Sequence, residues 1–299
     1  MAYKQDVLEM LYIVRGDITT TEADAIVDPT DRAFSGMGGV DYAVHKAAGY
    51  KLDQMLRTVQ KIEECQAIMT PAFDIRTARH IIHMVGPQWK NGFCHEEIKL
   101  AECYRNILKL AIENRCGSVA FPCISTGKKG FPEKRAAEIA LNTVYNMMNA
   151  MDAPCLSRIL FVCSSEHQEK NYKTQLARMI TDEFIRLYSP ESYHNDPSAE
   201  RYAAYMHLLA ELEWGGIKHY SEYCANFAGI SCNKLSDEYT EYDRYALNMD
   251  KWDYNTCLSY IIYLQRSAYW SGGLEAPHYD QWGNGTVRKV LMRMQALRN

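Results

Sequence analysis

One short stretch decides the fold: Phe121-Pro122-Cys123-Ile124-Ser125-Thr126-Gly127-Lys128-Lys129-Gly130-Phe131-Pro132. It leads from an apolar strand through two glycines into a helix, and proline is common in the first helical turn because its ring fixes φ. The Gly-Lys-Ser/Thr order of a Walker loop is absent from it. The stretch therefore predicts a strand–loop–helix connection that can cradle a phosphate.

A second glycine loop opens an earlier helix and has the sequence Ser35-Gly36-Met37-Gly38-Gly39-Val40-Asp41. Glycines let the backbone approach a ligand, and the N-terminus of the following helix offers free N–H groups and a partial positive charge. Two such loops facing one diphosphate are more specific than either alone. Asp41 has two interpretations here: it complements the helix dipole, or it holds or deprotonates a water molecule beside a ligand.

A carboxylate follows the first apolar run, in the stretch Arg15-Gly16-Asp17-Ile18-Thr19. Asp17 could accept a hydrogen bond from an exocyclic amine such as adenine N6. It could equally cap a turn, and taken by itself the turn is the simpler interpretation.

Residues 1–185 alternate apolar strand-like runs with helical periods, which predicts an α/β domain with a mixed sheet. The expected strands are Leu11–Val14, Ala25–Val27, Ala67–Thr70, Ile81–Val85, Ser118–Pro122 and Ile159–Cys163. The expected helices are Val40–Ala48, Glu97–Asn114, Pro132–Met151 and Gln168–Leu187.

The pattern of apolar and polar residues changes around residues 189–198, which are polar and rich in turn-forming residues. Four of the five tryptophans lie beyond this segment, among helical periods such as Leu258, Ile261, Ile262 and Leu264. We therefore predict a first domain over residues 1–188, a linker, and a smaller, mainly α-helical domain over residues 199–299. A length of 299 residues suits two domains.

Charge and composition exclude some classes of partner. The formal net charge is -4 and neither half of the chain is basic, so a nucleic-acid partner is not expected. No run of about 18 apolar residues is present to span a membrane, and Met1–Met10 does not resemble a signal peptide. Ten cysteines without a CxxC pair indicate reduced thiols, and hence a cytoplasmic protein.

The order of the motifs resembles that of macrodomains, especially the branch of mono-ADP-ribosyl hydrolases and O-acetyl-ADP-ribose deacetylases. The resemblance covers about residues 8–185. It is carried by Gly16–Thr19, Asp24–Val27, Gly38–Asp41, Ala43–His45, Ile81–Pro87 and Phe121–Gly130. It implies a three-layer α/β fold with a mixed sheet, and ADP-ribose lying across the carboxyl edge of that sheet.

The resemblance also implies roles for single residues. Asp17 would hold the adenine amine, assisted by the backbone of Ile18. Asp41 matches the catalytic aspartate of the hydrolases, His45 matches a histidine on the same helix, and no metal or cofactor is implied. The diphosphate would lie between two sets of residues: Gly38, Gly39 and Val40 on one side, and Ser125, Thr126, Gly127, Lys128, Lys129, Gly130 and Phe131 on the other.

The sequence departs from the family pattern after the second strand, where Asp28-Pro29-Thr30-Asp31 replaces the usual Asn-Ala-Ala-Asn. Asp31 takes the place of the asparagine that holds the terminal ribose, and an ionised carboxylate can only accept hydrogen bonds. We expect like charge on Asp31 and Asp41 to raise one of the two pKa values and to weaken binding. Asp31→Asn should then bind ADP-ribose more tightly, with a flatter pH profile.

Two aromatic side chains of the family pattern are also replaced. Lys129 stands between the last two glycines of the second loop, and Ser164 stands at the end of the last strand, with Phe161 as the nearest ring in sequence. A lost stacking ring would weaken binding by on the order of 1 kcal/mol.

Three functional hypotheses follow. The first is a hydrolase that removes ADP-ribose from protein side chains or cleaves an ADP-ribose ester; its partners are ADP-ribose and possibly ADP-ribosylated protein. The second is a binding module or sensor with the helical domain as its output. The third is recognition of another nucleotide. The C-terminal part resembles a small helical bacterial family of unknown function, and its Arg266–Gly273 stretch is interpreted mainly as core and turns.

Overall fold

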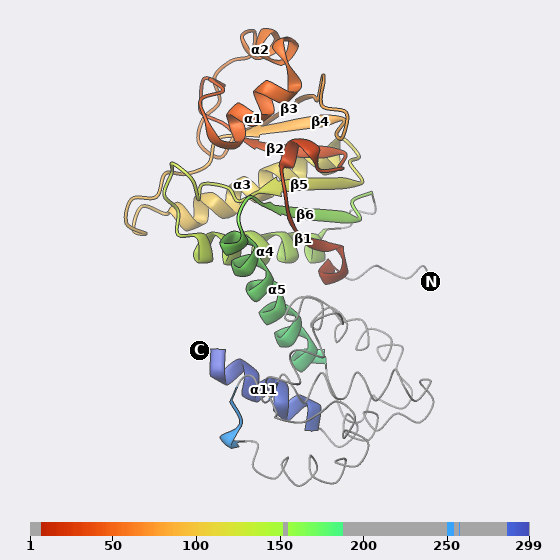
Figure 1. The fold of residues 1–299 in the computed structure, drawn as a ribbon, viewed down its shortest axis with the longest axis vertical. Helices are drawn as coiled ribbons and strands as arrows, with labels where there is room; N and C mark the ends of the chain where they lie inside the picture. Colours follow the sequence, from red (N-terminus) through yellow and green to blue (C-terminus); the bar gives the residue numbers. More distant parts are fainter. Residues whose placement is uncertain (1–6, 152–154, 188–249, 254–256, 258–285, 299) are drawn as a thin grey trace. The chain divides into compact units, whose positions relative to one another are not determined.

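A computed structural model describes residues 7–151, 155–187, 250–253, 257 and 286–298 (Figure 1). The chain divides into two compact units, Met1–Gln175 and Leu176–Asn299. The predicted linker 189–198 and most of the predicted helical domain, including Leu258–Leu264 and Arg266–Gly273, lie outside the described residues. The domain limits 1–188 and 199–299 therefore stay a prediction.

The six strands of the first unit form one mixed sheet in the order β1-β6-β5-β2-β4-β3. Only β3 runs antiparallel to its neighbour, β4, and the other pairs are parallel. The mixed sheet predicted from the sequence is confirmed. The strands are β1 Leu11–Arg15, β2 Ala25–Pro29, β3 Ala67–Pro71, β4 His80–Met84, β5 Ser118–Pro122 and β6 Arg158–Cys163.

Helices cover both faces of the sheet, which gives three layers (Figure 1). One face packs against α1 and α2 through a core that includes Ile26, Val44 and Leu52. On the other face, the Phe121 and Phe161 rings of the sheet contact Tyr104 of α3 and Tyr172 of α5. The helical segments are η1 Val7–Met10, η2 Ile18–Thr20, α1 Gly39–Ala48, α2 Tyr50–Leu56, α3 Glu96–Glu113, α4 Glu133–Ala150 and α5 Glu166–Leu187.

The predicted helices are present, with ends shifted by two residues or fewer. Helix α2 was not predicted, because a single residue, Gly49, separates it from α1. Gly49 has a φ of 79°, which is not helical, and it is both the C-cap of α1 and the N-cap of α2. In the second unit, α11 (Thr286–Arg298) buries Val290, Leu291 and Met294.

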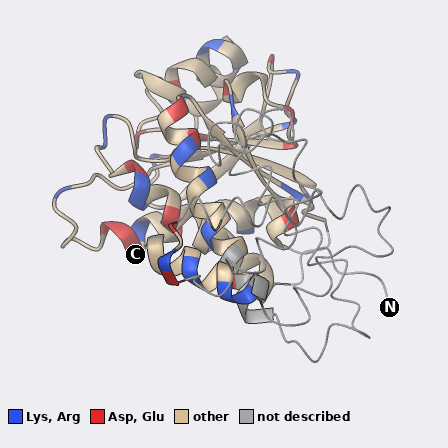
Figure 2. Ribbon diagram, turned by 60° about the horizontal axis from the view of Figure 1, so that its bottom comes forward, with Lys and Arg blue, Asp and Glu red and all other residues tan. Residues whose placement is uncertain are grey.

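Acidic and basic side chains alternate along the described helices (Figure 2), and several of them pair. The guanidinium of Arg135 on α4 donates to both carboxylate oxygens of Glu97 on α3 at 2.6 Å, and Lys99 Nζ lies 2.6 Å from Glu64 Oε2. Charges of both signs therefore neutralise one another at these positions. Among the described helices, none is long and apolar enough to cross a membrane.

The loop between β4 and α3 is organised by one buried carboxylate, Glu96. Its Oε1 accepts hydrogen bonds from the N–H groups of Lys90 at 3.0 Å and of Asn91 and Gly92 at 3.2 Å, and its Oε2 accepts one from Cys94 N at 2.6 Å. Burial acts to raise the pKa of Glu96, but these backbone hydrogen bonds outweigh it and hold the pKa at about 2. The loop is therefore fixed by an ionised glutamate.

This geometry predicts how acid destabilises the fold. The pKa of Glu96 falls from 4.5 on folding to about 2, so Glu96 contributes stability above pH 4.5 that is lost as the pH falls toward 2. We expect Glu96→Gln to lower stability at neutral pH and to flatten the fall between pH 4.5 and 2. Chemical denaturation of both proteins across this range measures the effect. Parallel curves for the two proteins would contradict the assignment.

Candidate functional site

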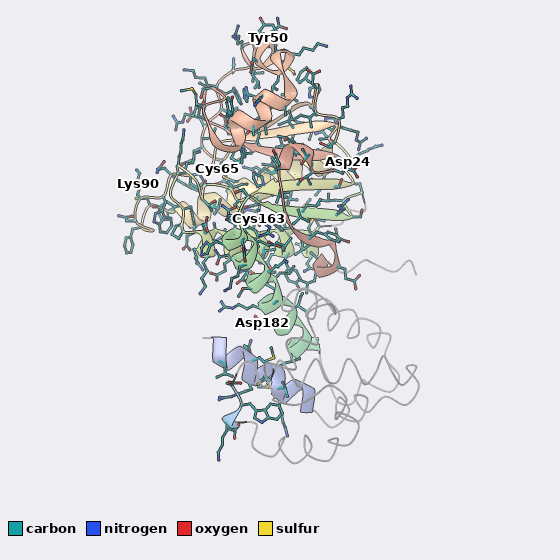
Figure 3. The ribbon with its side chains drawn as sticks, in the orientation of Figure 1. Asp24, Tyr50, Cys65, Lys90, Cys163 and Asp182 are labelled. Carbon is teal, nitrogen blue, oxygen red and sulfur yellow. The ribbon has the colours of Figure 1, made fainter. Side chains whose placement is uncertain are left out.

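The predicted site residues gather at one edge of the sheet. In Figure 3, Asp24, which precedes β2, lies at the right end of the sheet, whereas Cys163 at the end of β6 and Lys90 beyond β4 lie toward the left. The carboxyl ends of the five parallel strands therefore face left, together with the loops that follow them. In α/β sheets this edge is where ligands bind, at the point where the strand order reverses.

The two glycine loops are joined at this edge. Lys128 of the second loop donates from Nζ to the carbonyl oxygen of Met37 in the first loop at 3.1 Å. Gly38 has a φ of 93°, and a Cβ atom there would lie 2.8 Å from Lys128 Nζ. Helix α1 starts at Gly39 without a side-chain cap. The structure thus brings together Gly38, Gly39, Val40 and Lys128, around a helix N-terminus suited to an anion.

The second loop is a compact turn held by its own backbone. Phe131 N donates to Ser125 O at 3.0 Å, and Gly130 N donates to Gly127 O at 2.9 Å. Thr126 Oγ1 donates to Cys123 O at 2.9 Å. A Cβ atom on Gly127 or Gly130 would meet no other atom within 4 Å. These two glycines therefore leave an open approach to the backbone.

The side chains of two second-loop residues that were predicted to contact a diphosphate have partners within the protein. Phe131 is buried, and the centre of its ring lies 4.6 Å from that of Trp89, so this side chain packs inside the protein and anchors the end of the loop. Lys129 donates from Nζ to Gly86 O at 2.5 Å. Burial lowers the pKa of Lys129, against the opposite effect of nearby carboxylates that include Asp31 and Asp41. The partly buried side chain of Lys129 thus links the second glycine loop to the loop that follows β4.

Asp17 caps a turn, which is the simpler of the two interpretations that the sequence left open. Its Oδ1 caps η2 by accepting hydrogen bonds from Thr19 N at 2.9 Å and Thr19 Oγ1 at 2.8 Å. The side chain is exposed, so its second oxygen remains accessible from solvent. Ile18 is buried against α1 and α2, and only its backbone can serve a ligand.

Asp31 does not pair with Asp41 as predicted. Its carboxylate accepts hydrogen bonds from Ala33 N at 2.8 Å, from Ser35 N at 3.3 Å and from the Ser35 hydroxyl. Burial acts to raise the pKa of Asp31, but these hydrogen bonds outweigh it and hold the pKa below its ordinary value. Asp31 therefore caps its own turn, and the expectation that it titrates with Asp41 was wrong. The expectation that Asp31→Asn binds ADP-ribose more tightly rested on repulsion between Asp31 and Asp41, and it is therefore withdrawn.

The carboxylate beside Asp41 is instead Asp28. Burial and the charge of Asp28 raise the pKa of Asp41 to about 6, although the Thr30 hydroxyl, His45 and the N–H of Met37 act in the opposite direction. Met37 N donates to Asp41 Oδ2 at 3.0 Å, and Asp41 Oδ1 lies 3.5 Å from His45 Nε2. Asp41 therefore does have a second carboxylate beside it, but this is Asp28 and not the predicted Asp31.

A buried relay that the sequence did not reveal holds Asp28. His83 Nδ1 lies 2.8 Å from Asp28 Oδ2, and His83 Nε2 lies 3.0 Å from Thr70 Oγ1. Thr70 Oγ1 also donates to Pro71 O at 3.1 Å, so the relay runs from Asp28 through His83 and Thr70 to the backbone of β3. A period-2 pattern in β4 could have placed His83 beside β2, but nothing in the sequence gave its partner.

The end of β6 has no stacking ring from the candidates that the sequence offered. Phe161 lies between Phe121, at 5.7 Å, and Tyr172, at 5.2 Å, in the core. Ser164 N and Oγ both donate to Gln168 Oε1 at 3.0 Å. An adenine held here would contact small polar groups.

A mixed α/β sheet with two glycine loops at its carboxyl edge is an arrangement suited to a phosphate-containing ligand. The family model "Macro domain" matches residues 27–140. A macro domain-containing protein of Chlorobaculum tepidum is 40% identical over 168 residues, which is 56% of this chain and 96% of that protein. The chain belongs to the macrodomain family.

Relatives with more specific names cover the same part of the chain. A protein of Enterobacter cloacae named O-acetyl-ADP-ribose deacetylase is 41% identical over 170 residues, covering 56% of this chain and 93% of that protein. A structure of the Oceanobacillus iheyensis macrodomain with ADP has 34% identity and a TM-score of 0.56, and covers 60% of this chain and 97% of that one. The Trypanosoma brucei macrodomain in complex with ADP-ribose has 31% identity and a TM-score of 0.52, and covers 56% of this chain and 70% of that one.

Proposed function

We propose that the first unit binds ADP-ribose across the carboxyl edge of the sheet and hydrolyses an ADP-ribosyl linkage, with an ester such as O-acetyl-ADP-ribose as the preferred class. The observation that carries this proposal is the pair of glycine loops joined by Lys128, with the buried Asp41 behind them. The relatives named O-acetyl-ADP-ribose deacetylase support the class of substrate.

In this proposal the diphosphate lies between the N-terminus of α1 and the loop 125–130, where backbone N–H groups and the helix dipole favour negative charge. The terminal ribose then lies near Asp41, whose carboxylate takes a proton from water as the water attacks the ester carbonyl. The bond between the acyl carbon and the ribose oxygen breaks, the acyl group leaves as acetate, and the ribose oxygen takes the proton that Asp41 accepted from water. Orientation by the two loops supplies a large part of the rate.

The test has two parts that separate binding from chemistry. Calorimetry with ADP-ribose, ADP, NAD and cyclic ADP-ribose measures which ligand the full chain binds. Chromatography then measures the release of ADP-ribose from O-acetyl-ADP-ribose and from mono-ADP-ribosylated protein. Absence of binding to every ligand at millimolar concentration would refute the proposal as a whole.

A binding module without turnover is the second candidate, and the geometry of Asp31 favours it. The carboxylate of Asp31 already accepts hydrogen bonds from Ala33 and Ser35, and when ionised it has no proton to donate to a terminal ribose. Tight binding of ADP-ribose together with no release from either substrate would select this candidate.

Asp17 provides a prediction about the base. We expect Asp17→Asn to weaken ADP-ribose binding about tenfold, near 1.4 kcal/mol, because an amide nitrogen cannot accept from the adenine amine. The amide oxygen still caps Thr19, so the turn remains intact. The analogue with hypoxanthine, which carries a carbonyl in place of the amine, should lose less affinity or gain some. Equal changes for both ligands in calorimetry would show that Asp17 only caps its turn.

A further inference from the structure

Three buried side chains near the glycine loops direct metal-binding atoms toward one point. One atom each from Asp28, Asp41 and His45 lies within 4.8 Å of the other two. Asp28 is fully buried, Asp41 is 6% exposed and the His45 side chain is 10% exposed. Within the described ranges of the chain, this is the only group of its kind.

The atoms that face this point lack hydrogen bonds. Asp28 Oδ1, Asp41 Oδ1, His45 Nε2 and the hydroxyl of Thr30, which is 2% exposed, make no hydrogen bond of normal geometry with the described residues. The polar groups beside Asp41 come from this same set: His45 Nε2 lies 3.5 Å from its Oδ1, and the Thr30 hydroxyl lies close to its carboxylate. Buried polar atoms are rarely left unpaired, because each then loses its hydrogen bonds to water without replacement. Four such atoms on four neighbouring side chains indicate a ligand that the protein itself does not supply.

The opposite atom of each side chain is already held. Asp53 Oδ1 lies 2.6 Å from His45 Nδ1, His83 Nδ1 lies 2.8 Å from Asp28 Oδ2, and Met37 N donates to Asp41 Oδ2 at 3.0 Å. A carboxylate on the far nitrogen of a histidine fixes the ring and its tautomer, and outer partners of this kind are typical of metal sites. If these three side chains only shared protons among themselves, their positions would not require a partner on each of the atoms that point away from the group.

We propose that Asp28, Asp41 and His45 bind a divalent cation, with the Thr30 hydroxyl as a fourth ligand. Two carboxylates with one imidazole suit Mn²⁺ and Zn²⁺, and two negative charges match one dication. Around an octahedral ion such as Mn²⁺, ligand atoms at about 2.1 Å are about 3.0 Å apart when adjacent and about 4.2 Å apart when opposite. The 3.5 Å between Asp41 Oδ1 and His45 Nε2 already fits. The other pairs of ligand atoms lie up to 4.8 Å apart, and each pair would approach by on the order of half an ångström when the ion binds.

This inference goes beyond the proposed function, because the resemblance to macrodomains implies no metal and the test needs no nucleotide. The full chain is freed of metal with a chelator and titrated with Mn²⁺, followed by electron paramagnetic resonance. Mn²⁺ is preferred as the probe because the ten cysteines of the chain favour softer ions such as Zn²⁺. We expect one bound Mn²⁺ per chain, with nitrogen coupling from His45 in the electron spin echo.

Variants locate the bound ion. Asp28→Asn and His45→Gln should weaken Mn²⁺ binding at least tenfold, and His45→Gln should abolish the nitrogen coupling. Asp53→Asn, which loosens the His45 ring, should weaken binding about 10- to 100-fold. His167→Gln is the matched control, since His167 also pairs with a carboxylate, that of Glu133, but is 74% exposed; its Mn²⁺ affinity should equal that of the wild type.

Absence of stoichiometric Mn²⁺ binding would overturn the proposal, as would wild-type affinity in Asp28→Asn. Asp28→Asn preserves shape, and thermal unfolding of each variant shows whether it has folded. Calorimetry with ADP-ribose in the presence of chelator keeps the two conclusions separate. If ADP-ribose binds and Mn²⁺ does not, only this inference fails; if Mn²⁺ binds and ADP-ribose does not, the proposed function fails.

Discussion

Asp41→Asn should lower the turnover of O-acetyl-ADP-ribose by about 10²- to 10⁴-fold, the range for a lost general base. The amide keeps an oxygen for the N–H of Met37, so the loop of residues 35–38 retains its hydrogen bond. Binding of ADP-ribose should change by less than about threefold, because the diphosphate contacts come from the glycine loops. A large loss of turnover with little loss of affinity is the signature of a group that acts on the reacting atoms.

The measurement compares kcat and KM for the release of ADP-ribose with the calorimetric affinity. Glu138→Gln is a matched control, since it also exchanges a carboxylate for an amide, but on α4 in an ion pair with Arg135 at 2.7 Å. Its turnover should equal that of the wild type. Wild-type turnover in Asp41→Asn would remove Asp41 from the mechanism, and the hydrolase proposal would lose its base.

The sequence predicted the fold well because the fold depends on short local signals. Alternating apolar runs and helical periods gave each strand and four helices, and Pro132 and Gly49 marked helix boundaries. Helix α2 was missed because seven residues carry too little periodicity to be distinguished from a loop. The order of the strands in the sheet depends on long-range pairing, which local patterns do not encode.

The site was predicted in part, for a related reason. Glycine loops are local features, so both were found, but the partner of each polar side chain depends on distant contacts. Asp31 was expected to pair with Asp41, since the resemblance to macrodomains implies that both lie beside the terminal ribose. The structure instead binds Asp31 within its own turn, through Ser35, and places Asp28 beside Asp41. Hydrogen bonds from nearby backbone N–H groups stabilise the negative charge of Asp31, whereas a contact with the negative charge of Asp41 would not.

Gly39→Glu should abolish ADP-ribose binding while leaving the protein folded. Gly39 is the first residue of α1, and a Cβ atom there meets no other atom within 4 Å, so a side chain has room in the empty site. A glutamate would fill the space proposed for the diphosphate with a second negative charge. The same charge is favourable at a helix N-terminus, which limits the damage to stability.

A smaller substitution separates the two causes of the loss. The φ of Gly39 is 63°, so any other residue strains the backbone by about 1–2 kcal/mol. Gly39→Ala carries this strain without the bulk or the charge, and it should retain measurable binding. We therefore expect calorimetry to show no binding for Gly39→Glu at millimolar ADP-ribose and weakened binding for Gly39→Ala, with thermal unfolding confirming both folds. Affinity of Gly39→Glu within about tenfold of wild type would place the diphosphate elsewhere, because strain alone accounts for a loss of that size.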